Sequence, residues 1–280
     1  MSNKIDFTNI NPVSKKEISK IKNDIFTVIK NKNFILGNEV KTFENNFSKI
    51  TKSKFSVGCA SGTDALTLSL MSLNLKKNDE VIVPGLSYIS TGLSVILNNN
   101  KLIFADIDDE TGLIDINQVK KKITKKTKAV IPVNLYGQKV DLQKLRKIVG
   151  KKISIIEDSA QSHFAYNEDD AKITTNKFAD ASCYSFYPAK NLGAYGDGGL
   201  VSTNKKSLYK KLLALRNLGS VKKYEHFLIG RNSRLDTIQA VVLTNKLNSV
   251  LKLNEKRRKI ANYYDKLLKS IKEIKLTKTN

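Results

Sequence analysis

Hydrophobic positions in the first 50 residues recur at helical spacing. Ile18, Ile21, Ile25 and Ile29 follow one another at intervals of three and four, which places them on one face of a helix. From Phe55 onward the pattern changes to short apolar runs that are rich in β-branched and aromatic residues, as expected of buried strands. These runs are FSVGCA, EVIVPG, KLIFADI, KAVIPVNLYG, ISIIEDSA and ASCYSFY.

Amphipathic stretches separate these runs. They predict helices over residues 63–75, 90–98, 117–123 and 142–149. The regular alternation of strands and helices indicates the α/β class, with a mostly parallel central sheet flanked by helices. The active site of such a sheet is expected at the carboxyl ends of its strands.

The pattern turns helical again after the segment GGLVSTN. It predicts a helix over residues 207–218 and a long one over 236–268, after which IKEIKLTKTN begins a strand-like alternation. We therefore expect three parts: an N-terminal helical segment (1–50) packed on a large α/β domain (51–235), and the start of a small, truncated C-terminal domain (236–280).

Composition excludes several classes of protein. Hydrophobic residues make up 40% of the chain, no apolar run approaches the roughly 18 residues needed to span a bilayer, and the first residues do not read as a signal peptide. Cys59 and Cys183 lie far apart without a metal-type spacing, which predicts two reduced, buried cysteines. We expect a cytoplasmic protein that has no metal site and does not bind membranes.

The net charge of +23 raises the possibility of nucleic-acid binding. The excess is nearly all lysine and is spread over the whole length, whereas arginine, which suits bidentate contacts to phosphates and bases, is scarce. The densest run, Lys120–Lys128, reads as a solvated helix end that leads into a buried strand. The charge favours mild attraction of an anionic small substrate over a nucleic-acid partner.

Candidate chemistry follows three of the predicted strands. In GCASGTDALTLSL a strand ends at Ala60, and Ser61–Gly62–Thr63 opens a helix, so free backbone N–H groups and hydroxyls form an anion site. In ISIIEDSAQSHFA, Asp158 follows an apolar strand. An ordinary N-cap would explain the first segment and a capping aspartate the second, so neither is specific alone.

The third segment is SFYPAKNLGAYGDGG, in which Lys190 precedes a glycine-rich loop. A phosphate site, a carboxylate and a lysine at three strand ends of one sheet suggest pyridoxal 5'-phosphate. The lysine amine would form a Schiff base with the cofactor aldehyde and later transfer a proton. The aspartate would keep the pyridine nitrogen protonated, so that the ring withdraws electrons.

Taken together, six segments resemble the DegT/StrS-like family of nucleotide-sugar aminotransferases. They are GCASGTDAL, EVIVPGLSYIS, VIPVNLYGQ, IIEDSAQSHFA, SFYPAKNLGAYGDGGLV and GRNSRLDTIQAVVL, which lie in the family's order between Gly58 and Leu243. The resemblance implies the type I fold of pyridoxal-phosphate-dependent transferases, that of aspartate aminotransferase. Some members carry histidine in place of the lysine and act as dehydratases. The presence of Lys190 argues against dehydratase activity here.

The resemblance also implies residue roles. Lys190 would be the Schiff-base lysine and Asp158 the partner of the pyridine nitrogen, with Gln161 near the ring hydroxyl. The phosphate would be held by Gly62, Thr63 and Ser185.

Further roles reach beyond this core. Tyr88 would stack on the cofactor, with a core tyrosine on a helix as the alternative interpretation. Asn232 would reach the phosphate of a neighbouring subunit, which implies a homodimer with shared active sites. Tyr187, Tyr224 and His226 are candidate sugar contacts, or loop packing.

The glycine loop KNLGAYGDGG resembles members that aminate a 3-keto sugar. We therefore expect glutamate as the amino donor and a dTDP-linked 3-keto-6-deoxyhexose as the acceptor, in amino-sugar synthesis for lipopolysaccharide or other surface polysaccharides. Two alternatives stay open: a 4-keto nucleotide sugar as acceptor, and a truncated, catalytically impaired homologue that acts as a dimeric cofactor-binding protein.

Overall fold

A computed structural model describes residues 10, 13–165, 177–222 and 224–279 of the 280-residue chain. Its helices are α1 (Lys15–Asn31), α2 (Asn38–Thr51), α3 (Gly62–Ser72), α4 (Ile89–Ile96), α5 (Ile116–Lys122), α6 (Leu142–Val149), α7 (Lys206–Leu215) and α8 (Thr237–Leu268), with a short 3-10 turn at Leu135–Gly137. The strands are β1 (Phe55–Cys59), β2 (Glu80–Pro84), β3 (Lys101–Ala105), β4 (Thr127–Val130), β5 (Ser154–Asp158), β6 (Ala181–Ser185), β7 (Gly199–Thr203), β8 (Ser220–Lys222) and β9 (Glu225–His226).

Seven strands form one sheet in the order β1-β7-β6-β5-β4-β2-β3. The pairs from β6 to β3 are parallel, whereas β7 runs antiparallel to both of its neighbours, β1 and β6. Because β7 reverses direction, β1 and β6 point the same way and end at the same edge. The prediction of a mostly parallel sheet is confirmed, although the six predicted strands did not include β7.

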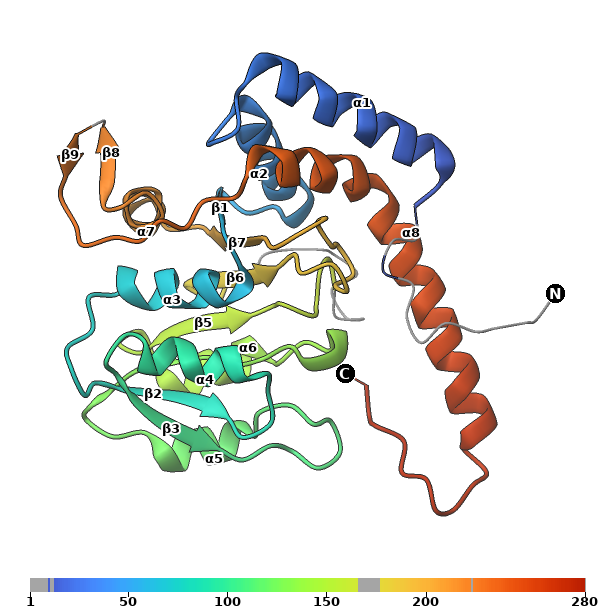
Figure 1. Ribbon diagram of the computed structural model, residues 1–280. Coiled ribbons are helices and arrows are strands. Elements are labelled where there is room, and N and C mark those ends of the chain that lie inside the picture. The colour runs from blue at the N-terminus through green and yellow to red at the C-terminus, as the bar shows by residue number, and fades with distance from the viewer. Residues whose placement is uncertain (1–9, 11–12, 166–176, 223, 280) are drawn as a thin grey trace.

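Helices cover both faces of this sheet (Figure 1). Alternate strand residues point to opposite sides: Cys183 and Val201 pack in a core with α3 and α7, whereas Tyr184 and Leu200 pack in a second core with α2 and the first half of α8. A third core joins α5 and α6 to β4 and β5. The result is a three-layer α/β/α arrangement of the type I transferases.

Most predicted helices agree with the structure to within a few residues, and α1 includes the four isoleucines of the predicted helix, although its apolar face is only partly buried. Ile21 and Val28 are its buried residues, whereas Ile18 and Ile29 are exposed. Figure 1 shows α1 lying across α8 at the outside of the molecule. A narrow row of buried side chains on α1 is therefore enough to form its contact with α8. The end of the chain also differs, since its described residues after α8 form no strand.

The N-terminal helices are tied to the sheet by a buried ion pair. Arg216 donates to the Glu44 carboxylate of α2 at 2.5 Å and to the carbonyl of Gly58 in β1 at 2.8 Å, and the Gly58 N–H donates to the same carboxylate oxygen. Both charged side chains are at least nine-tenths buried. The pair therefore joins α2, β1 and the end of α7.

Replacing Arg216 by methionine is expected to lower the free energy of unfolding by about 3–5 kcal/mol, because it leaves the Glu44 carboxylate buried without its cation. Chemical denaturation measures the loss. Glu255→Gln is the control: it breaks the exposed pair between Glu255 and Arg258 and should change the free energy by less than about 1 kcal/mol. An Arg216 variant as stable as its control would contradict this role.

Other expectations can be compared directly. Both cysteines are buried and free, as predicted. Lys120, Lys121 and Lys122 form the exposed last turn of α5, ahead of buried residues in β4, which confirms the reading of that lysine run. Over the described part of the chain, no helix is both long enough and apolar enough to cross a membrane.

Candidate active site

Four ends of strands meet at one edge of the sheet. In the antiparallel register, Gly199 at the start of β7 pairs with Cys59 on one side and with Ser185 on the other. Asp158 closes β5 and pairs with Cys183 of β6. The ends of β1, β5 and β6 are therefore neighbours, as the sequence predicted for residues 61–63, Asp158 and Ser185.

The first turn of α3 provides an anion site at this edge. Ser61 is the N-cap, and its Oγ accepts a hydrogen bond from the Asp64 N–H at 3.1 Å. The amides of Gly62 and Thr63 precede the first residue that can bond within the helix, so they have no intrahelical acceptor. Two N–H groups at the positive end of α3 thus remain available for a phosphate.

Gly62 lies against Ser185, which follows it by 123 positions in the chain. A Cβ atom at Gly62 would lie 2.5 Å from the Cβ and 3.0 Å from the Oγ of Ser185. Only glycine therefore allows the first turn of α3 and the end of β6 to approach so closely. This contact brings the serine hydroxyl beside the free amides.

Gly62→Ala is expected to destabilise the protein by about 1–3 kcal/mol, the usual cost of overpacking, and to weaken phosphate binding, because α3 and Ser185 must separate. Thermal unfolding and titration with the cofactor would measure the two effects. Gly85→Ala is the matched control, since its Cβ would meet only the Ala105 carbonyl oxygen at 3.7 Å. Equal behaviour of the two variants would show that the contact at Gly62 is unimportant.

Asp158 is buried and held at both carboxylate oxygens. The Ala160 N–H donates to Oδ1 at 3.1 Å, and the Thr91 hydroxyl donates to Oδ2 at 2.8 Å. Burial raises the pKa of Asp158 above its ordinary value, although these hydrogen bonds and the charge of Lys190 oppose the shift. A buried carboxylate with a raised pKa is stabilised when a cation approaches it.

Lys190 lies in the tight loop between β6 and β7. Its N–H donates to the Tyr187 carbonyl at 2.8 Å, and the Ala194 N–H donates to the Phe186 carbonyl at 2.8 Å. Burial lowers the pKa of the half-buried Lys190 amine, with Asp158 acting in the opposite direction. A lowered pKa leaves more of the amine unprotonated, which is the form that attacks an aldehyde.

The site therefore presents three functional groups in fixed places. The α3 amides and Ser185 suit a phosphate, the buried Asp158 suits a protonated ring nitrogen, and the Lys190 amine interacts electrostatically with Asp158. These are the three attachment points that pyridoxal 5'-phosphate requires, and the close approach of Gly62 to Ser185 brings the serine hydroxyl and the α3 amides together beside one phosphate. The residues present fit this cofactor.

Several predicted residues line the same region. Thr63 Oγ1 lies 2.7 Å from the Ser90 hydroxyl, which links α3 to α4. Gln161, in the loop after β5, accepts a hydrogen bond from the Tyr136 N–H at 2.7 Å. Tyr88 is the N-cap of α4 and is exposed rather than packed in the core, and Tyr187 is exposed as well. The stacking role of Tyr88 stays a prediction.

The remaining predicted residues lie on or near the hairpin of β8 and β9. Figure 1 shows this hairpin far from the carboxyl ends of β5 and β6. Tyr224 is exposed at its turn, and His226 Nδ1 lies 3.0 Å from the Leu218 carbonyl. Asn232 is exposed and pairs with Asn217 in an isolated bridge. Within one chain, Tyr224 and His226 are not brought to Lys190, and the roles of all three stay predictions.

The sequence analysis missed residues that support the site. Thr91 orients Asp158 and in turn lies 2.7 Å from the Ser87 hydroxyl. Ser233 accepts from the Ala60 N–H and donates to Asp64, which anchors the start of α3. Ser87 and Ser233 lie inside segments already singled out by resemblance, and Thr91 directly follows one of them. Their polarity alone did not indicate which hydroxyl would face a carboxylate.

His163 was also missed. Its ring is buried against Tyr184 and Phe186, and neither ring nitrogen has a hydrogen-bond partner among the described residues. Burial lowers the pKa of His163 to about 3, although the nearby Ser185 backbone opposes part of the shift. The imidazole is therefore neutral and serves as part of the packing beneath Ser185.

The fold and the site define a pyridoxal-phosphate-dependent transferase of the aspartate aminotransferase type. More narrowly, the chain belongs to the DegT/DnrJ/EryC1/StrS aminotransferase family, whose model matches residues 15–280. Pyridoxal phosphate is the cofactor of this family, and the relatives named below are sugar aminotransferases.

Named relatives act on several nucleotide sugars. The chain is 41% identical over 262 residues to the dTDP-3-amino-3,6-dideoxy-alpha-D-galactopyranose transaminase of Aneurinibacillus thermoaerophilus, covering 93% of this chain and 70% of the relative. It is 37% identical over 268 residues to the UDP-2-acetamido-2-deoxy-3-oxo-D-glucuronate aminotransferase of Pseudomonas aeruginosa, covering 95% and 74%. The chain spans about two thirds of the length of the curated relatives that it matches.

A solved structure shows the same fold. The crystal structure of ntda from Bacillus subtilis, with the cofactor PMP bound, superimposes with a TM-score of 0.90 at 29% identity, covering 98% of this chain and 62% of that one.

Proposed function

We propose that this protein transfers an amino group from glutamate to a keto sugar linked to a nucleotide. The arrangement of Lys190 beside Asp158, at the edge formed by Ser185 and the start of α3, carries the proposal. When bound, pyridoxal phosphate supplies an aldehyde that accepts the amino group and a ring that stabilises negative charge at the substrate carbon.

The chain's own residues would supply position and proton transfer. The amides of Gly62 and Thr63, with the Ser185 hydroxyl, hold the phosphate. Asp158 holds the proton on the ring nitrogen, and Thr91 and the Ala160 N–H keep its carboxylate in place. The Lys190 amine, freed once the amino donor has bound, moves a proton between the substrate carbon and the cofactor.

The acceptor that we propose is a dTDP-linked 3-keto-6-deoxyhexose. The glycine loop KNLGAYGDGG supports a 3-keto sugar, and so do the two relatives described above, whose names refer to a 3-amino and a 3-oxo sugar. One relative uses a dTDP sugar and the other a UDP sugar, so the nucleotide and the 6-deoxy position rest on resemblance to the first. Surface polysaccharide synthesis in the cytoplasm is the proposed context.

We also propose a homodimer that shares its active sites. The hairpin of β8 and β9 and the loop after it expose several apolar side chains: Val221, Tyr224, Phe227 and Ile229. A second subunit that covers this hairpin would bury them and bring Asn232 to a neighbouring phosphate. Sedimentation as a monomer at ordinary salt would count against the role of Asn232.

The test uses the purified chain loaded with pyridoxal phosphate. Glutamate should convert the bound cofactor to its amine form, seen as a loss of visible absorbance, and the amine form should then react with a keto-sugar nucleotide. A panel of dTDP-3-keto, dTDP-4-keto and UDP-3-keto sugars would identify the acceptor. Cofactor binding without any response to glutamate would contradict the proposal and favour a non-catalytic cofactor-binding protein.

A further inference from the structure

Helix α8 holds the loop that carries Lys190 through three polar side chains. Gln239 Oε1 accepts from the Tyr195 N–H at 2.9 Å, Lys246 Nζ donates to the Gly193 carbonyl at 2.7 Å, and Asn254 Oδ1 accepts from Asn191 Nδ2 at 2.8 Å. Steps of seven and eight residues are close to two helical turns each, so these side chains lie along one side of α8.

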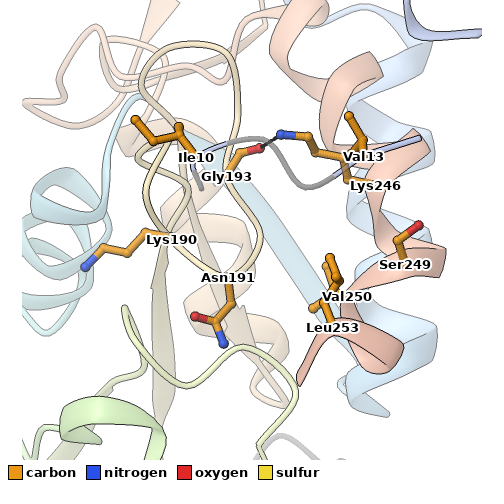
Figure 2. Close-up of a pocket in the computed structure, with 9 residues that line it drawn as sticks. All are labelled: Ile10, Val13, Lys190, Asn191, Gly193, Lys246, Ser249, Val250 and Leu253. Atoms are coloured by element: carbon orange, nitrogen blue, oxygen red, sulfur yellow. Dashed lines mark hydrogen bonds between the residues drawn. The ribbon is translucent and has the colours of Figure 1, made fainter. Parts of the chain in front are cut away.

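The loop is also constrained by its own tightly folded backbone, in addition to these hydrogen bonds. A Cβ atom at Gly193 would lie 2.3 Å from the Pro188 carbonyl oxygen, so the chain folds tightly back on itself around Lys190. Figure 2 shows the Lys190 side chain directed away from α8, while Lys246 reaches the Gly193 carbonyl from the other side of the loop. The position of the Lys190 backbone therefore depends on how α8 holds the loop.

Asn254 differs from the other two because it also forms a hydrogen bond to a different loop. Its Nδ2 donates to the His163 carbonyl at 2.8 Å, and His163 lies in the loop that follows Asp158. Asn191 is the residue next to Lys190. One side-chain amide thus connects the loop that carries the lysine to the loop that follows the aspartate.

The chemistry of this link requires an amide. The His163 carbonyl can only accept, so the NH2 group of Asn254 must face it, and its oxygen must then face Asn191. Aspartate at 254 would place a carboxylate against a carbonyl oxygen, and leucine would lose both bonds. The orientation of Asn254 is therefore determined by its partners.

We propose that Asn254 is a positioning residue for Lys190, which sets the placement of the lysine amine relative to Asp158 by joining the two loops to α8. The inference deepens the proposed function and rests on it. Asn254 itself does not contact the cofactor site, and it acts through Asn191 and His163.

The experiment compares Asn254→Leu with Asn262→Leu, which makes the same substitution at an exposed position of α8. The first readout needs no cofactor: the rate at which Lys190 is acetylated by acetic anhydride, resolved by peptide mass spectrometry across pH. Burial is the main cause of the lowered pKa of Lys190, and a displaced loop would expose the amine. In Asn254→Leu the pH midpoint of Lys190 acetylation should therefore rise, whereas Asn262→Leu should match the native chain.

The second readout is the rate at which borohydride fixes pyridoxal phosphate onto Lys190. A displaced lysine should slow this reaction by about tenfold to a hundredfold, the usual effect of a misplacement near 1 Å. If both readouts of Asn254→Leu equal those of Asn262→Leu, Asn254 is only a structural residue and the inference is wrong. If the native chain itself is not fixed at Lys190, it is the proposed function that fails, and the acetylation readout still decides the role of Asn254.

A double-mutant cycle covers the case in which Asn254→Leu does not fold. Asn191→Ala and Asn254→Ala each remove one side of the same hydrogen bond, so their effects on Lys190 acetylation should be less than additive in the double variant. Full additivity would show that the two residues act independently and would overturn the proposal.

Discussion

Lys190→Ala is expected to abolish covalent attachment of pyridoxal phosphate and to lower amino transfer by at least about a thousandfold. The size follows from the two tasks of this amine, since proton transfer by a positioned side chain alone contributes about a hundredfold to ten-thousandfold. The cofactor should still bind, because Asp158, Ser185 and the α3 amides are unchanged. Borohydride reduction followed by peptide mapping would show no modified peptide.

Lys190→Arg is the control for charge. It keeps a cation near Asp158 but cannot form a covalent bond with the aldehyde, so it should be as inactive as the alanine variant while retaining more cofactor. A small primary amine added to Lys190→Ala should restore part of the proton transfer. An active Lys190→Ala protein, with cofactor fixed on a different lysine, would contradict the site described here.

Asp158→Asn is expected to weaken cofactor binding and to slow the reaction by about a hundredfold to a thousandfold, the range found when one preorganised charge-stabilising group is removed. In the protein without cofactor the same substitution should be stabilising. Burial raises the pKa of Asp158, so the folded state binds its proton more tightly than the unfolded state does. This carboxyl therefore destabilises the fold increasingly as the pH rises above its ordinary pKa.

The stability gap between Asp158→Asn and the native chain should thus be present at neutral pH and should close as the pH falls toward the ordinary pKa of 3.8. Thermal unfolding measures it, and for a chain of this size each kcal/mol corresponds to about 2–4 °C. Asp108→Asn is a control in which the pKa of the native carboxyl is shifted in the opposite direction. Hydrogen bonds from the Thr111 backbone and side chain lower the pKa of exposed Asp108, so that variant should be less stable than native at neutral pH, again with a gap that closes on acidification.

The sequence was sufficient to predict the architecture and the centre of the site. Strand runs ending in Asp158 and Ser185 indicated which side chains share an edge, because parallel strands end together. The antiparallel strand β7 was not predicted, because GGLVSTN contains two glycines, which are unfavourable in strands, and is followed directly by a helix. The pattern showed which residues of α1 are apolar, but it could not show that the rest of the protein buries only Ile21 and Val28.

Contacts between distant segments could not be predicted. The spacing in the chain does not reveal that Gly62 would touch Ser185, or that Thr91 would donate to Asp158. Asn254 lies in a long, charged helix whose second half is mostly exposed, and it reads as an ordinary surface residue. The role of Asn254 depends on which loops lie beside it, and tertiary packing determines which loops these are.

The position of β7 between β1 and β6 has a consequence for synthesis of the chain. Among the described strands, β1 lies at the edge of the sheet and pairs with β7 alone. Its register partners lie about 145 residues later, as in Phe55 with Thr203. While a ribosome makes residues 60 to 198, β1 has no strand to pair with, and contacts of such long sequence separation form slowly. The phosphate site between α3 and β6 can be completed only after β7 has been made. Cofactor added during translation would therefore bind only after β7 has been made.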